Sequence, residues 1–161
     1  MILDLETAIV ERLTASLQGV RVEAFPDDPA SYALKHPRGA VLVGYGRSTY
    51  GAPQAMDVIA QERQLEFDIT VLARNLRAGG AQGGAYAYLD AVRVALTGWR
   101  PEGARKMYPL RDRFLGVRDG VWRYAITVAT SAVVLETAEA EQAAALQRIT
   151  LSEHLAMGDD T

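Results

Sequence analysis

The chain has 161 residues, of which 49% are hydrophobic and 23% charged, with a formal net charge of −3 and no cysteine. This composition predicts one folded domain and excludes disulfides, zinc–thiolate sites and a cysteine nucleophile. The charge balance gives no general attraction to nucleic acid or to an anionic membrane. The opening MILDLETAIVERL lacks the pattern of a signal peptide, so we expect a soluble protein made in the cytoplasm, without membrane contact.

The first expected element is an amphipathic helix over residues 4–18. Apolar residues recur there at spacings of three and four, which places them on one face: Ile2, Leu5, Ile9, Leu13 and Leu17. Asp4 is expected to cap the start of this helix, and Gly19 follows its end. Residues 20–24 then alternate as a strand does.

The middle of the chain predicts loops and strands. Residues 26–38 contain three prolines and are expected to form a loop. Residues 40–43 form a short apolar run that predicts a buried strand, and residues 44–57 are expected to be a flexible connection or a hairpin tip. The clearest strand covers residues 62–73, where apolar residues alternate with polar ones.

The second half predicts a helix and a strand pair. A glycine-rich loop precedes the expected helix 85–97, whose apolar stripe is Ala85, Leu89, Val92 and Leu96. Asp119–Gly120 is a strong turn signal between strands 108–117 and 121–135. The second of these strands is long, and part of it is expected to extend beyond the sheet.

This order of elements predicts an α+β fold. We expect a mainly antiparallel or mixed sheet of four to five strands, with two helices packed on one face, in a domain over residues 1–136. Residues 137–161 are expected to be an acidic C-terminal arm, partly helical or disordered. Residues 136–161 carry six acids against one base, which leaves the rest of the chain at about +2.

The motifs that carry chemistry are weak in this sequence. Gly44-Tyr45-Gly46 lacks the spacing of a dinucleotide-binding loop, and the GGAQGG cluster lacks the Lys-Ser/Thr of a P-loop. His36 and His154 are isolated, and no serine has the context of a nucleophile. We therefore expect no catalytic residue, cofactor or metal site.

Basic residues form the remaining candidate site. One interpretation is an ordinary solvated surface, and the other is an electropositive side that meets the acidic side of a neighbouring copy, or DNA in a lumen. The expected subunit or partner interface consists of these residues: Arg74, Asn75, Arg77, Arg105, Lys106, Arg111 and Arg113.

The run ITVLARNLRAGGAQGGAYAYLDAVRVALTGW resembles the small tail proteins of Mu-like prophages, which are similar to tail terminators. The resemblance covers about residues 1–135. It implies a structural, non-enzymatic subunit at the head-proximal end of the tail in a virion with a contractile tail. It also implies a homo-oligomeric ring, expected to be a hexamer, that contacts tail tube, sheath and neck or connector proteins, with non-specific contact to DNA in the tail lumen.

Two other classes of protein fit the residues. A small α+β ligand-binding domain or enzyme predicts a deep pocket, and Arg74, Asn75 and Arg113 lining it together would favour that class. A prophage toxin, antitoxin or regulatory adaptor predicts specific DNA binding, for which the sequence shows no helix-turn-helix pattern.

Overall fold

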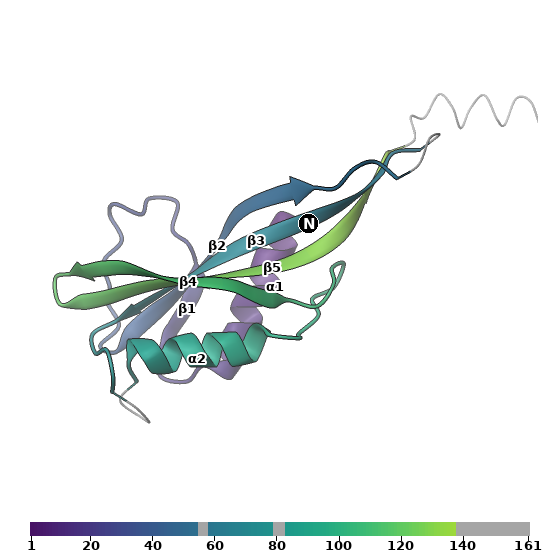
Figure 1. Cartoon of the computed structure of the whole chain (residues 1–161). Coiled ribbons are helices and arrows are strands. Elements are labelled where there is room, and N and C mark those ends of the chain that lie inside the picture. Colours follow the sequence, from purple (N-terminus) through teal and green to yellow (C-terminus); the bar gives the residue numbers. More distant parts are fainter. Residues whose placement is uncertain (55–57, 79–82, 138–161) are drawn as a thin grey trace, which may run out of the picture.

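The computed structural model describes residues 1–54, 58–78 and 83–137, which form two helices and one five-stranded sheet (Figure 1). The elements are α1 (Ile2–Ser16), β1 (Arg21–Ala24), β2 (Gly39–Tyr50), β3 (Ala60–Ala73), α2 (Ala85–Leu96), β4 (Tyr108–Arg118) and β5 (Val121–Leu135). The strand order is β1-β2-β3-β5-β4, with β1 parallel to β2 and every other pair antiparallel. The expected α+β fold with a mixed sheet is confirmed.

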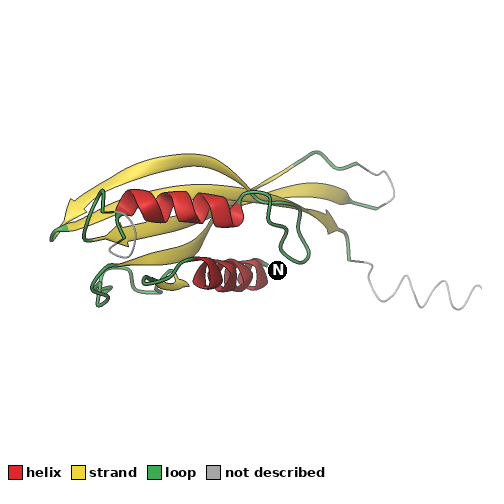
Figure 2. Ribbon diagram, turned by 90° about the horizontal axis from the view of Figure 1, so that it is seen from below, coloured by secondary structure: helices red, strands yellow, loops and turns green. Residues whose placement is uncertain are grey.

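One face of the sheet packs against both helices (Figure 2). The period-two alternation of β3 points its apolar residues to this face, where they are fully buried: Leu65, Phe67, Ile69 and Val71. The buried stripe of α1 is Leu5, Ile9 and Leu13, and α2 contributes Tyr88, Val92 and Leu96. The apolar periodicity of the sequence therefore identified the main core, except that Tyr88 is buried in α2 and the expected Leu89 is only partly buried.

The start of α1 differs from the expectation. The helix begins at Ile2, so Asp4 lies inside the first turn and does not act as the N-cap. Its carboxylate instead pairs with the Met1 ammonium group. That hydrogen bond and the positive charge lower the pKa of Asp4.

The expectation for residues 44–50 is wrong, because β2 continues through them to Tyr50. Gly44 pairs with Asp68 of β3, and a register shift between Tyr45 and Arg47 marks a β-bulge. The glycines that suggested a loop are accommodated inside the strand. A Cβ on Gly44 would lie only 3.1 Å from Cβ of Phe25, which packs close to the backbone there.

The strand β5 is long, but it does not leave the sheet. It pairs with β3 from Trp122, opposite Ala73, to its last residue Leu135, opposite Ala60. Only its first nine residues also pair with β4, so the far ends of β3 and β5 project from the body (Figure 1). The expected hairpin turn is confirmed, since Asp119 and Gly120 both have positive φ.

Some expectations concern residues outside those described. The expected helix at 138–148 and the rest of the C-terminal arm beyond Thr137 are among them. So are residues 79–82 of the glycine-rich loop. The domain boundary at residue 136 therefore stays a prediction.

Candidate interaction surface

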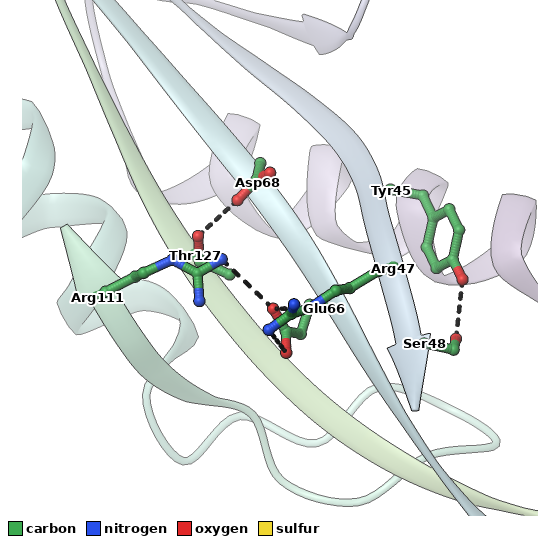
Figure 3. A network of polar contacts seen from close by, with 7 residues as sticks. All are labelled: Tyr45, Arg47, Ser48, Glu66, Asp68, Arg111 and Thr127. Carbon is green, nitrogen blue, oxygen red and sulfur yellow. Dashed lines mark hydrogen bonds and ion pairs between the residues drawn. The ribbon is translucent and has the colours of Figure 1, made fainter. Parts of the chain in front are cut away.

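The face of the sheet away from the helices, here called the open face, carries polar and charged side chains. Because neighbouring residues of a strand point to opposite sides, the buried Phe67 is flanked by Glu66 and Asp68 on the open face. Thr127 of β5 lies across from Asp68 in the register and donates a hydrogen bond of 2.5 Å to its carboxylate (Figure 3). The open face is therefore an ordered polar surface.

Glu66 is the centre of this surface, and its side chain is only 6% exposed. Arg47 donates a hydrogen bond of 3.1 Å from Nη2 to Oε1 of Glu66 (Figure 3). The other oxygen, Oε2, lies 3.1 Å from Nε of Arg47 and 3.5 Å from Nη2 of Arg111. Neither contact is aligned as a hydrogen bond, so Oε2 is stabilised by charge alone. The contact with Glu66 also raises the pKa of Arg47.

A cleft of about 630 Å³ opens on the same face, between the proline loop and the β4–β5 turn. Apolar residues of the strands and the loop form much of its lining: Phe25, Tyr32, Leu34, Leu42, Leu72, Leu115 and Val121. Its polar residues include Arg74, Arg118, Asp119 and Arg123. The cleft thus combines an apolar surface with an excess of cations.

Tyr32 holds the proline loop against the sheet. Its hydroxyl donates a hydrogen bond of 2.8 Å to Oε1 of Glu23 in β1, and its ring packs with Leu34 against the buried Leu42 and Leu72. Burial, reinforced by the bond to Glu23, raises the pKa of Tyr32 to about 12. The loop wall of the cleft is therefore anchored by both polar and apolar contacts.

The arginines of the cleft retain hydrogen-bonding capacity. Arg74 donates one hydrogen bond of 3.2 Å to the carbonyl of Leu34, which uses one of the five N–H groups of a guanidinium. Nε of Arg123 is buried without an acceptor among the described residues. Arg118 lies 3.8 Å from Asp119, and both side chains are strongly exposed. The remaining N–H groups of these arginines can donate hydrogen bonds to carboxylate groups of another molecule.

A second surface lies on the helix side, where β4 runs along the edge of the sheet and α2 leaves aromatic rings uncovered. The ring centroids of Phe114 and Tyr124 lie 5.0 Å apart. Tyr86 of α2 makes an edge contact with Tyr124, with 6.1 Å between the ring centroids. Phe114 is 53% exposed and Tyr86 is 44% exposed. Arg77 lies over the ring of Tyr86. We call Arg77, Tyr86, Phe114 and Tyr124, with the partly exposed Trp122, the aromatic patch.

The edge of β4 itself is interrupted. Register shifts occur between Pro109 and Arg111 and between Phe114 and Gly116. Bulges and proline hinder the addition of another strand. Contacts at this edge are therefore favoured through side chains rather than through a continued sheet.

The structure does not bring the seven expected interface residues into one site. Arg74 lines the cleft, whereas Asn75 and Arg113 do not, so the arrangement that would favour a ligand-binding domain or enzyme is not present. Asn75 holds the start of α2, since its carbonyl accepts from the Ala85 N–H at 2.9 Å. Arg77 belongs to the aromatic patch.

The remaining four candidates are separated in the same way. Arg105 and Lys106 are exposed in the segment before β4, where Arg105 lies 3.6 Å from Glu62. Arg111 and Arg113 are exposed on β4, and Arg111 is partly engaged with Glu66. The residues of the expected electropositive side are therefore divided among several separate surfaces. A role for any of the seven in assembly stays a prediction.

Sequence reasoning missed the roles of Glu66, Arg47 and Tyr32. The alternation of β3 already placed Glu66 on the polar face. Its pairing with Arg47 was not predicted, because the glycines of residues 44–50 indicated a loop where β2 continues. Among the described residues, no group of three or more His, Cys, Asp or Glu is placed to hold a metal ion. No helix there is long and apolar enough to cross a membrane.

Comparison with known proteins gives a family and a weak structural likeness. A family model described as Gp37 protein matches residues 9–153. No curated protein matches the sequence. A chain from a structure titled "Virion of native gene transfer agent (GTA) particle" is 22% identical, with a TM-score of 0.47 over 81% of this chain and 94% of that one. The family match continues past residue 137 into the segment expected to be an arm.

Proposed function

Because this chain belongs to the Gp37 protein family, we propose that it is a structural protein of a phage-type particle that acts by assembly. The sequence resemblance to the small tail proteins of Mu-like prophages supports this role. In its finer form, the proposal is a tail terminator or tail-completion subunit. Copies form a ring, expected to be hexameric, at the head-proximal end of a contractile tail and contact tube, sheath and neck proteins.

The observation that carries the proposal is the aromatic patch. Large exposed apolar patches on soluble proteins mark interaction sites, and interfaces are enriched in Tyr, Trp, Phe and Arg. Here the exposed rings of Tyr86 in α2 and Phe114 in β4 meet the partly buried Tyr124 of β5 beside Arg77. The interrupted edge of β4 favours a side-chain contact with a neighbouring subunit over the addition of a strand.

The test compares Phe114→Glu with Val94→Glu. Phe114 is in the aromatic patch, whereas Val94 is a similarly apolar residue of α2 that is 72% exposed outside it. We expect sedimentation velocity and negative-stain electron microscopy to show rings, and binding to tail tubes, for the wild type and Val94→Glu but not for Phe114→Glu. Circular dichroism checks that both variants are folded.

The contrary results are equally clear. A wild-type chain that stays monomeric and never associates with tube, sheath or neck subunits would overturn the proposed function. Rings that form normally with Phe114→Glu would show that the aromatic patch is not the contact between copies.

A further inference from the structure

We propose that the cleft on the open face is a docking site for the C-terminal segment, residues 138–161, of a neighbouring copy. This inference rests on the proposed function only in that copies must associate. It adds a specific contact between them, at a surface separate from the aromatic patch.

The first argument is the chemistry of the cleft. Three guanidinium groups, those of Arg74, Arg118 and Arg123, lie beside apolar residues such as Leu42 and Leu72. Within the described residues, neither Arg74 nor Arg123 forms an ion pair, and Arg118 has only the exposed Asp119, 3.8 Å away. A partner that supplies both carboxylates and apolar side chains would satisfy this lining.

The second argument is charge complementarity with the segment itself. Residues 138–161 contain five acidic residues and one basic residue, Arg148. They carry a formal charge of −4 against −3 for the whole chain, so residues 1–137 are left at +1. The segment also carries apolar residues between its acids, among them Leu146, Ile149 and Leu151. Its composition thus matches the mixed lining of the cleft.

The third argument is where the segment starts. It follows the end of β5, which pairs with the beginning of β3, whereas the cleft is lined by Val121 and Arg123 at the beginning of β5. About 14 residues of strand at roughly 3.3 Å each separate the two, or about 45 Å. To reach the cleft of its own chain, the segment would have to reverse and return over that distance. A neighbouring copy needs no such return, so the arrangement favours a head-to-tail contact.

The experiment uses the full chain with a photo-reactive phenylalanine analogue at Ala30, an exposed residue of the cleft. Equal amounts of this protein and of ¹⁵N-labelled wild type are mixed, irradiated and digested. We expect mass spectrometry to find cross-links from the unlabelled cleft to ¹⁵N-labelled peptides within residues 138–161. Cross-links confined to unlabelled peptides of the same chain would overturn the proposal, as would cross-links to other segments or to none.

Charge reversal sharpens the result. Arg74→Glu combined with Arg118→Glu should lower the yield of this cross-link about tenfold, because both groups face the cleft. Arg93→Glu reverses the same kind of charge at an exposed position of α2, outside both the cleft and the aromatic patch, and should leave the yield unchanged. Adding Glu139→Lys and Glu141→Lys to the labelled chain should restore the yield with the double variant. Equal loss with Arg93→Glu would overturn the proposal, since the effect of charge reversal would then be non-specific.

The two proposals fail in different ways. Rings that form without the cross-link would overturn the docking site and leave the proposed function standing. A chain that neither assembles nor cross-links would overturn both.

Discussion

The two faces of the sheet are held by different kinds of interaction, although the same strands form both. On β3, the adjacent residues Glu66 and Phe67 point to opposite sides, and both are almost completely buried. Phe67 is buried among helix side chains. Apolar contact there is non-directional, so it does not require a particular orientation of the neighbouring groups. Glu66 is buried among arginines, where each polar atom needs a matched partner. The helix face therefore supplies stability, and the open face supplies specific polar contacts.

The largest expected effect is on the helix face. Phe67→Ala should lower the free energy of unfolding by about 3–5 kcal/mol, because it leaves a cavity at the centre of the core. Urea denaturation measures the loss. Leu3→Ala, at a position that is 72% exposed on α1, should change stability by less than about 0.5 kcal/mol. A comparable loss for both variants would contradict the packing described here.

A smaller loss is expected on the open face. Glu66→Ala should cost about 1–2 kcal/mol, since the freed arginines are half exposed and can turn toward water. Glu62→Ala is the matched control, because Glu62 forms an exposed pair with Arg105 and should cost under about 0.5 kcal/mol. Denaturation of both variants and a double-mutant cycle with Arg47→Ala measure the coupling. A coupling near zero would show that the network on the open face is electrostatically unimportant.

The smallest effect concerns the wall of the cleft. Tyr32→Phe removes the hydrogen bond to Glu23 and should cost about 0.5–1.5 kcal/mol at neutral pH. The pKa of Tyr32 is raised to about 12, above an unfolded value of about 10. Its contribution is therefore fully present below pH 10 and is lost as pH rises toward 12.

Absorbance titration of the phenol groups checks this assignment. The difference between the wild type and Tyr32→Phe should show a tyrosine that ionises near pH 12. An ionisation near pH 10 in that difference would mean that Tyr32 is not held against Glu23, and the loop would then not form a fixed wall of the cleft.

Local sequence pattern was enough to predict the helix face. The spacing of Leu5, Ile9 and Leu13 and the alternation of β3 follow from the periods of a helix and a strand, so local pattern was sufficient. The same holds for the turn at Asp119–Gly120, because positive φ at both positions is a local requirement. The α+β class followed from the order of these elements.

The open face, in contrast, depends on contacts between residues that are distant in the sequence. β2 contains glycines but is a strand, because β3 supplies its hydrogen-bonding partners. Local propensity does not include such pairing with another strand. Arg47, Glu66 and Arg111 come from three strands, and the cleft joins the proline loop to a hairpin some 90 residues later. Contacts between residues so distant in sequence depend on the register of the sheet. The expected single basic interface was therefore divided, and the cleft became visible only in the fold.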